Sequence, residues 1–325
     1  MSRPSILATH PLFPEARAIL DAHCDVEYWS RPERPTRAEF LKQVAAKDGL
    51  VCLLTEKIDK DMLATAPKVR IVSNVAVGFD NVSVPDCTAR KVAVTNTPGV
   101  LDETTADFAW TLLMCVARRV GEGEALARSG QWAGWNLDQL CGGDVWGKTL
   151  GVIGFGRIGR AVARRSLGFK MKVIYTDALR ATPEAERESA ARFVDLDTLL
   201  SEADFVTVHV PLMPETRHLI SAERLKKMKR SAYLINTARG PVVDNEALYQ
   251  ALKAGTIAGA ALDVHEHEPA VHAGLITLQN VVLEPHLASA SIETRTKMAV
   301  MAADNLTAFF AGRRPPNILN PEVLG

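Results

Sequence analysis

The sequence lacks both an apolar run long enough to span a membrane and an excess of charge of either sign. Lys plus Arg and Asp plus Glu each number 38 in 325 residues, so the formal net charge is zero and no basic surface for nucleic acid is predicted. Charged residues interrupt the apolar stretches before they reach membrane length. The opening segment MSRPSILATHPLF, broken by His10 and Pro11, fits neither a signal peptide nor a spanning helix. We expect neither nucleic acid nor membrane as a partner.

Cysteine is also scarce, with five residues in the chain and no CxxC pair. An odd, scattered set does not indicate a disulfide framework, and it favours a reduced cytoplasmic interior with buried, inert thiols. These residues are Cys24, Cys52, Cys87, Cys115 and Cys141.

What the sequence does contain is an ordinary globular composition, 47% hydrophobic, in which short β-branched runs alternate with helical patterns. This alternation is typical of α/β layers around parallel sheets. The first hundred residues or so predict strands at SILAT, VEYW, GLVCLL, RIVSNV and VAVTN. A second series follows at TLGVIG, KVIYTD, DFVTVHV, AYLINTA, IAGAALDV and NVVLEPH. We therefore expect two α/β domains, with a dinucleotide-binding type of unit that begins in mid-chain.

The stretch TPGVLDETTADFAWTLLMCVARRV separates the two series. It opens with a Pro-Gly break and capping residues and then predicts one long helix that is apolar on most faces. We expect this helix to be buried between domains or subunits.

A glycine-rich turn follows the first strand of the second series. TLGVIGFGRIGRAVA places Gly154, Gly156 and Gly159 after a buried strand and at the opening of a helix. The three glycines permit a tight turn, close backbone approach to a pyrophosphate, and close packing of helix on strand. The next strand ends in Asp177, where an acidic side chain holds the adenosine ribose. This context favours a dinucleotide site over a bare turn.

Asp177 also bears on which dinucleotide binds, because a carboxylate repels the additional phosphate of NADP. NAD(H) is therefore favoured. Arg180 lies close enough in the sequence to leave NADP(H) open.

Charged side chains follow the last three predicted strands. Arg239 follows AYLINTA, the run from His265 to Glu268 follows IAGAALD, and His286 follows NVVLEP. Since ligands bind at the carboxyl ends of parallel strands, we expect these side chains to converge beside the glycine turn. The set suits hydride transfer to a 2-keto acid: a guanidinium binds the carboxylate, an imidazolium protonates the carbonyl oxygen, and a carboxylate orients the imidazole.

Each of these residues also has a purely structural interpretation. Arg239 can cap a loop, His286 can be an ordinary strand-end histidine, and the glutamates can be solvated. The HEHE run also admits a metal site, because alternate residues of a strand share a face, but a clear third ligand is missing. The convergence of the three groups favours the catalytic interpretation, with no metal.

These blocks resemble the D-2-hydroxyacid dehydrogenases, most closely the glyoxylate and hydroxypyruvate reductases, some of which also reduce 2-ketogluconate. The similar segments are GFGRIG, Asp177, NTARGPVVDNEAL, ALDVHEHEP and PHLASA, together with VAVGFDNV at residues 75–82, TARKVAVTNTP and DETTADFAW. The likeness extends over essentially the whole chain and implies an oxidoreductase acting on small 2-keto or 2-hydroxy acids.

The resemblance also implies roles for particular residues. Arg239, Glu268 and His286 are the implied catalytic trio, and Val77 and Gly78 join Arg239 in holding the substrate. The implied cofactor contacts are Gly154, Gly156, Arg157, Ile158, Gly159, Asp177, Val210, Pro211, Thr237 and Asp263. Departures from the family pattern are His265, where Phe is usual, His267, where Glu or Gln is common, and Ala288, where Gly is usual.

The implied architecture is a Rossmann NAD-binding domain, residues 100–286, inserted into a flavodoxin-like substrate domain, residues 1–99 plus 287–325. The resemblance further implies hinges near Pro98 and His286 and a homodimer built around the long helix near residue 105. Another class stays open, since some proteins of this fold act as NAD-sensing corepressors.

Overall fold

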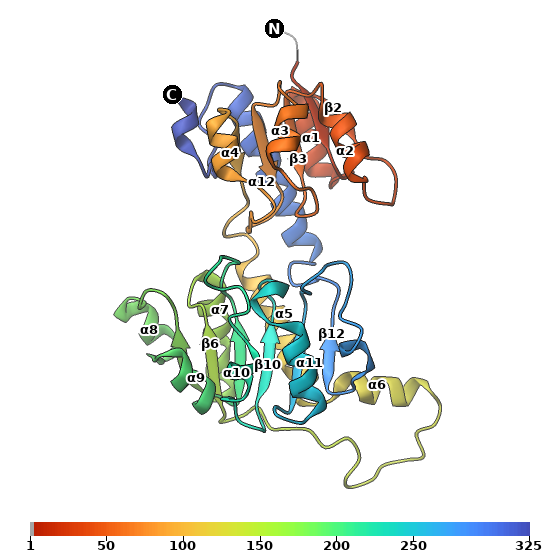
Figure 1. Cartoon of the computed structure of the whole chain (residues 1–325), viewed down its shortest axis with the longest axis vertical. Helices are drawn as coiled ribbons and strands as arrows, with labels where there is room; N and C mark the ends of the chain where they lie inside the picture. The colour runs from red at the N-terminus through yellow and green to blue at the C-terminus, as the bar shows by residue number, and fades with distance from the viewer. Residues whose placement is uncertain (1–2) are drawn as a thin grey trace. The chain divides into compact units, whose positions relative to one another are not determined.

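The computed structural model describes residues 3–325, which form two compact units (Figure 1). Residues 1–2 of the opening segment lie outside the described range. Unit 1 takes the chain up to Leu101 and again from Ala290 to Gly325, and unit 2 is the continuous segment Asp102–Ser289. Both are α/β structures, as the alternating pattern predicts.

The described part of unit 1 contains a five-stranded, wholly parallel sheet in the order β2-β1-β3-β4-β5. This is the flavodoxin-like strand order, whose switch point lies between β1 and β3. Its strands are β1 (Ser5–Ala8), β2 (Asp25–Tyr28), β3 (Gly49–Cys52), β4 (Ile71–Asn74) and β5 (Ala93–Thr95).

Helices cover the unit 1 sheet, and the last long helix of the chain returns to it. α12 packs on α1, β3 and β4, and the hydroxyl of Ser291 begins it by accepting the N–H of Thr294 at 3.1 Å. The helices are α1 (Pro14–His23), α2 (Arg37–Val44), α3 (Lys60–Thr65), α4 (Val84–Ala89), α12 (Ile292–Phe310) and the 3₁₀ turn η4 (Pro321–Leu324).

Unit 2 contains a seven-stranded parallel sheet in the order β12-β11-β10-β9-β6-β7-β8. The winding reverses between β6 and β9, which is the switch point where Rossmann folds bind dinucleotides. The strands are β6 (Thr149–Ile153), β7 (Lys172–Thr176), β8 (Ala191–Phe193), β9 (Phe205–Val208), β10 (Tyr233–Asn236), β11 (Gly259–Leu262) and β12 (Val281–Leu283).

Both faces of the unit 2 sheet are buried, which explains its nearly continuous apolar strands. Leu234 and Ile235 are neighbours on β10, yet they pack into separate hydrophobic clusters on opposite faces. The covering helices are α5 (Asp102–Ala117), α6 (Val120–Arg128), α7 (Arg157–Arg165), α8 (Pro183–Ser189), α9 (Leu196–Glu202), α10 (Ala222–Leu225) and α11 (Asn245–Lys253), with 3₁₀ turns η1 (Ser166–Phe169), η2 (Gly240–Val242) and η3 (Leu275–Thr277).

The prediction of one long helix between the two strand series is wrong in its length. α5 ends at Ala117, Arg119 adopts a left-handed conformation with φ 54°, and α6 begins afresh at Val120. Within unit 2, α5 packs on α7, β10, β11 and β12. The expectation that this helix also lies between domains or subunits stays a prediction.

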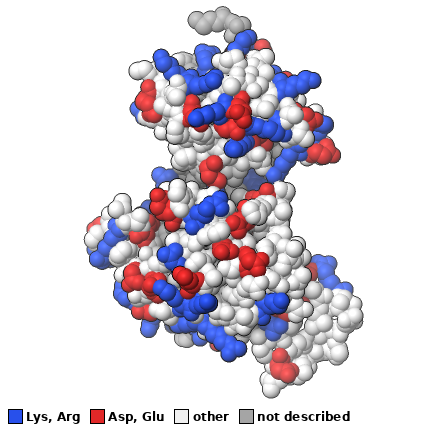
Figure 2. Space-filling view, viewed as in Figure 1, with Lys and Arg blue, Asp and Glu red and all other residues white. Residues whose placement is uncertain are grey.

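The face of the molecule in Figure 2 shows acidic and basic side chains interspersed, with no broad patch of one sign. Among residues 3–325, no helix combines the length and the apolar character needed to span a bilayer.

Candidate active site

The glycine-rich turn leads from β6 into α7. Gly154 has a φ of 91°, and a Cβ added to it would lie 2.7 Å from the carbonyl carbon of His209. A Cβ on Gly159 would lie 2.0 Å from the carbonyl oxygen of Gly154, so helix and turn are in direct contact. Both positions therefore require glycine for conformation or for space.

The residues of this turn fit a dinucleotide. A Cβ added at Gly156 would meet nothing within 4 Å, so the backbone there borders open space. Gly156 begins α7 without a side-chain cap, which leaves the first N–H groups of the helix available to an anion. At the end of β10, the hydroxyl of Thr237 is buried and has no hydrogen-bond partner among the described residues. Such an orphaned hydroxyl is expected where a ligand completes the site.

Asp177 lies just after β7 and braces the glycine turn from the side. Its Oδ2 accepts the N–H of Phe155 at 2.6 Å, and its Oδ1 accepts the N–H of Ala178 at 2.6 Å. Each carboxylate oxygen can accept more than one hydrogen bond, so this bracing is compatible with binding a ribose hydroxyl. Sequence reasoning placed Asp177 at this edge but did not anticipate its contact with the turn.

Arg180, the residue that left NADP(H) open, is held by an acidic side chain. Its Nε and Nη2 donate to the two oxygens of Glu186 at 2.8 and 3.0 Å. The Arg180 guanidinium and the Tyr175 hydroxyl lower the pKa of Glu186 to about 2, which keeps this partner ionised. The charge of Arg180 is thus already paired within unit 2.

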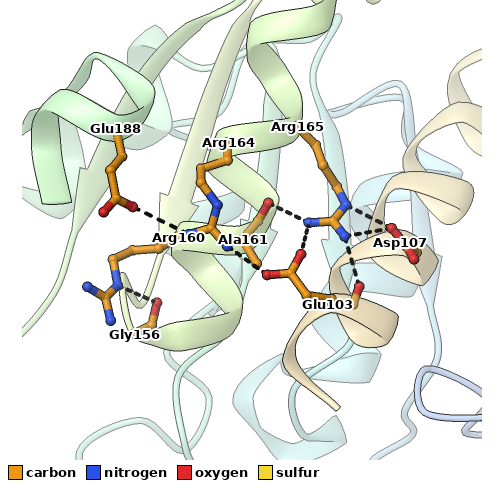
Figure 3. Close-up of polar contacts among 8 residues, drawn as sticks. All are labelled: Glu103, Asp107, Gly156, Arg160, Ala161, Arg164, Arg165 and Glu188. Carbon is orange, nitrogen blue, oxygen red and sulfur yellow. Dashed lines mark hydrogen bonds and ion pairs between the residues drawn. The ribbon is translucent and has the colours of Figure 1, made fainter. Parts of the chain in front are cut away.

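An ion cluster joins α7, the helix that follows the glycine turn, to α5 (Figure 3). Glu103 lies between two arginines and accepts from Arg164 at 2.7 Å and from Arg165 at 2.8 Å. Arg165 also donates to Asp107 at 2.7 Å. Hydrogen bonding to Arg165 lowers the pKa of Glu103 against its partial burial. The cluster fixes the direction of the helix whose first turn borders the candidate cofactor site.

Arg239 follows β10 in a short turn that Asn236 organises. The Asn236 side chain accepts the N–H of Ala238 at 3.0 Å and donates to the carbonyl oxygen of Arg239 at 3.0 Å. Sequence reasoning missed this residue, although an Asn that ends a buried strand is a recognisable turn signal.

Glu268 and His286 come from the loops after β11 and β12 and are in contact. Glu268 Oε2 lies 3.0 Å from His286 Nδ1, and Glu268 Oε1 accepts the N–H of His265 at 3.0 Å. Burial raises the pKa of Glu268, but His286 and the His265 N–H lower it by more, so the net shift is downward. The pair is therefore a charged carboxylate against an imidazole.

His286 itself stands in a left-handed conformation, with φ 60°, and Asp263 fixes the backbone there. The N–H of His286 donates to the carbonyl oxygen of Asp263 at 2.8 Å. The fully buried carboxylate of Asp263 accepts the N–H groups of Leu287 at 2.6 Å and Ala288 at 2.8 Å. Asp263 thus positions the backbone that carries the imidazole.

Strand order brings the three charged groups to one edge of the sheet. β10, β11 and β12 are neighbours and parallel, so the loops carrying Arg239, Glu268 and His286 leave the same edge side by side. A Cβ at Gly240 would lie 2.0 Å from the carbonyl carbon and oxygen of His265, so the first two loops touch. The two histidines of the HEHE run differ from each other in burial: His265 is buried and His267 is exposed.

Val77 and Gly78 lie in unit 1, in the loop after β4. The side chain of Asn96 donates to the carbonyl oxygen of Val77 at 2.8 Å, and that of Asn74 donates to the carbonyl oxygen of Gly78 at 3.0 Å. In a trans peptide the N–H points opposite to the carbonyl oxygen. The N–H of Gly78 is therefore directed away from Asn96.

Two other features of unit 2 bear on alternative sites. Within residues 3–325, the structure contains no group of three or more His, Cys, Asp or Glu arranged to hold a metal ion. A cavity of about 1390 Å³ borders Val116, Arg119, Tyr233 and Asn280, and none of Gly156, Arg239, Glu268 or His286 lines it. It borders the first residue of β10 and runs along the edge strand β12 to Glu284.

The fold, the glycine turn and Asp177 place the chain in the class of nicotinamide-dependent oxidoreductases. Residues 110–288 match the model of the D-isomer specific 2-hydroxyacid dehydrogenase, NAD binding domain. The glyoxylate reductase of Thermococcus litoralis is 48% identical over 99% of this chain and 98% of its own. That of Korarchaeum cryptofilum is 48% identical over 99% and 97%.

Solved structures agree with these sequence relatives. The TT0316 protein of Thermus thermophilus superposes with a TM-score of 0.91 at 42% identity, over 97% of this chain and 99% of that one. The NADPH-dependent glyoxylate/hydroxypyruvate reductase of Sinorhizobium meliloti, solved with NADP and malonate, gives 0.87 at 33% identity over 98% of both chains. The chain belongs to the D-isomer-specific 2-hydroxyacid dehydrogenase family.

Proposed function

We propose that this protein reduces small 2-keto acids to 2-hydroxy acids, with glyoxylate or hydroxypyruvate as the first candidates and NADH as the preferred cofactor. The observation that carries the proposal is the 3.0 Å contact between His286 and Glu268 on a loop pair beside Arg239. The relatives named above as glyoxylate reductases support the substrate class. 2-Ketogluconate and other 2-keto acids are the alternative substrates within it.

The chemistry follows from the charges of the three groups. The guanidinium of Arg239 offers paired N–H donors that match a carboxylate, so it fixes which way the keto acid faces. His286 Nδ1 is engaged with Glu268, so Nε2 is the nitrogen that delivers a proton to the carbonyl oxygen. Glu268 stabilises the protonated imidazole. When bound, the nicotinamide supplies the hydride to the carbonyl carbon.

We assign the loop of Val77 and Gly78 in unit 1 to binding the substrate carboxylate through backbone N–H groups. The support is the contact of Asn96 with the carbonyl oxygen of Val77, which directs the N–H of Gly78 away from Asn96. The contact of Asn74 with the carbonyl oxygen of Gly78 directs the N–H of Phe79 away from Asn74 in the same way. Residues 1–99 plus 287–325 then form the substrate domain, and residues 100–286 form the cofactor domain.

The preference for NADH over NADPH rests on Asp177 and Arg180. The carboxylate of Asp177 repels a 2′-phosphate, and Arg180 is already paired with Glu186 at 2.8 Å. The relative from Sinorhizobium meliloti is named as NADPH-dependent, so the assay must include both cofactors.

We further propose a homodimer. α6 buries none of its residues within the chain, and the loop after it extends away from the rest of unit 2 (Figure 1). That loop exposes large apolar side chains, with Trp135 and Leu137 each 80% exposed. Exposed apolar surface of this kind marks a protein interface. A molar mass from light scattering near twice 35.3 kDa supports the dimer, and one near 35.3 kDa contradicts it.

We propose a cytoplasmic location on the basis of the cysteines. All five are free thiols, and Cys24, Cys52 and Cys87 are buried. Fractionation of the native host tests this location.

A panel of 2-keto acids, each supplied with NADH and with NADPH, tests the function. We expect oxidation of NADH with glyoxylate or hydroxypyruvate and a smaller rate with NADPH. Binding of NADH without turnover of any 2-keto acid contradicts the proposal and favours an NAD-sensing protein.

A further inference from the structure

His218 connects two of the loops that carry the proposed catalytic residues. It follows β9 and has a left-handed backbone, with φ 50°. Its N–H donates to the carbonyl oxygen of Pro241 at 2.8 Å, two residues beyond Arg239. Its Nε2 lies 2.6 Å from Oε1 of Glu266, two residues before Glu268. His218 thus contacts both loops: its backbone N–H binds the loop of Arg239, and its side chain binds the loop of Glu268.

The two loops are already packed against each other where His218 reaches them. A Cβ at Gly240 would lie 2.5 Å from the backbone nitrogen of Glu266, so no side chain fits between the two backbones. The segment of His218 also pairs with the first loop, through a parallel bridge between Ile220 and Val243. Small shifts of one loop are therefore passed directly to the other.

Glu266 is an acidic side chain only 15% exposed, and His218 is its closest partner. Burial raises the pKa of Glu266, but hydrogen bonds from His218 and from the N–H of Asn245, at 3.4 Å, lower it by more. Arg217 contributes a distant contact of 3.9 Å. Without His218 the carboxylate loses its main partner, and a poorly paired buried charge moves towards solvent.

We propose that His218 is a positioning residue for 2-keto acid reduction: through Glu266 it fixes the loop of Glu268 relative to the loop of Arg239. The inference rests on the proposed function. Arg239 sets where the keto acid is held, and Glu268 sets where His286 points. The spacing between these two loops therefore determines whether the proton donor meets the carbonyl oxygen, and misplacement by about 1 Å costs up to a hundredfold in rate.

The test compares His218→Leu with His218→Gln. Both side chains are unbranched at Cβ and bear the same left-handed backbone, but only Gln places a nitrogen donor where Nε2 lies. We expect His218→Leu to lower kcat/KM for glyoxylate by tenfold or more, through a lower kcat and a higher KM together. We expect His218→Gln to stay within about threefold of the wild type and the Kd for NADH to be unchanged in both.

His272→Leu is the matched control, because His272 also contacts a carboxylate at 3.0 Å, but that carboxylate is Glu246 on α11, outside the two loops at residues 238–244 and 263–270. It should leave kcat/KM within about twofold. The double variant His218→Leu/Glu268→Gln should lose less in kcat than the product of the single losses, because the placement of residue 268 matters less once its charge is removed. Equal activity of the Leu and Gln variants, or fully multiplicative losses, overturns the inference.

Hydrogen exchange separates this inference from the proposed function. In His218→Leu, residues 238–244 and 263–270 should exchange faster together, whereas His218→Gln should match the wild type. A wild-type protein that reduces no 2-keto acid overturns the function and with it the catalytic role of His218, while the exchange data still report whether the loops are coupled. If the wild type reduces 2-keto acids but His218→Leu exchanges at the wild-type rate in both loops, the coupling of the loops is overturned and the proposed function is not.

Discussion

His286 Nδ1 lies 3.0 Å from Glu268 Oε2, although the two residues stand on loops that leave different strands. The second oxygen of Glu268 is held by the N–H of His265 at 3.0 Å, so the carboxylate is fixed at both ends. His286 and the His265 N–H together lower the pKa of Glu268 despite its burial. The carboxylate is therefore ionised at neutral pH and favours the protonated imidazole.

Replacing Glu268 by Gln keeps the size and a hydrogen bond but removes the charge. Because the lowered pKa keeps the wild-type carboxylate charged through the assay range, Glu268 supports the protonated imidazole that donates the proton, and we expect the reduction rate to fall on the alkaline side of the pH–rate profile. Glu268→Gln should move that alkaline limb to lower pH. The measurement is the pH–rate profile of glyoxylate reduction, and an unmoved limb would remove Glu268 from the mechanism.

Arg239→Lys keeps the positive charge but loses the paired donors that match a carboxylate. We expect kcat/KM for glyoxylate to fall by a factor that corresponds to about 2–4 kcal/mol of lost transition-state stabilisation. The Kd for NADH should change little. Steady-state kinetics and a fluorescence titration with NADH measure the two quantities. Near-normal turnover would show that another group holds the substrate carboxylate.

Asp177→Asn should raise the ratio of kcat/KM for NADPH to that for NADH, mainly by improving NADPH. The Asn side chain retains an acceptor for the Phe155 N–H, so the glycine turn stays braced while the charge is lost. Glu186→Gln should raise the ratio further, because it releases Arg180 from its ion pair. A wild type that already prefers NADPH would contradict the assignment of Asp177.

The two histidines before Glu268 should differ in their effect on stability. His265 is 6% exposed and its Nε2 lies 2.9 Å from the carbonyl oxygen of Glu284, whereas His267 is exposed. His265→Ala should lower the free energy of unfolding by about 1–3 kcal/mol, and His267→Ala should change it by less than about 0.5 kcal/mol. Urea unfolding curves of the two variants measure this difference. Equal midpoints would contradict the predicted difference in stability.

The sequence predicts the parallel sheets well because their strands are apolar runs with β-branched residues. It does not predict β8, Ala191–Phe193, whose three residues are too few to give a periodic signal. It also misses the break at Arg119, because no Gly or Pro marks that position and the chain reverses through a left-handed arginine.

For the site, the sequence predicts which side chains stand at strand ends, since that depends only on strand order. It cannot predict the contacts of Asp177 with the glycine turn or of His218 with Glu266, because these join segments that are distant along the chain. His218 stands in a segment without a recognisable motif. Its partner Glu266 lies 48 residues further along the chain, so the sequence does not indicate that the two are in contact.

The most direct test of the account compares glyoxylate reduction by the wild type and by His286→Ala at neutral pH with saturating NADH. We expect a steady turnover by the wild type and a loss of about a hundredfold or more in kcat for the variant, the usual scale for a missing general acid. The Kd for NADH should be unchanged, and a strong chelator should not affect the wild type. Turnover by His286→Ala within a few fold of the wild type would contradict the central claim that His286, held by Glu268, protonates the carbonyl oxygen.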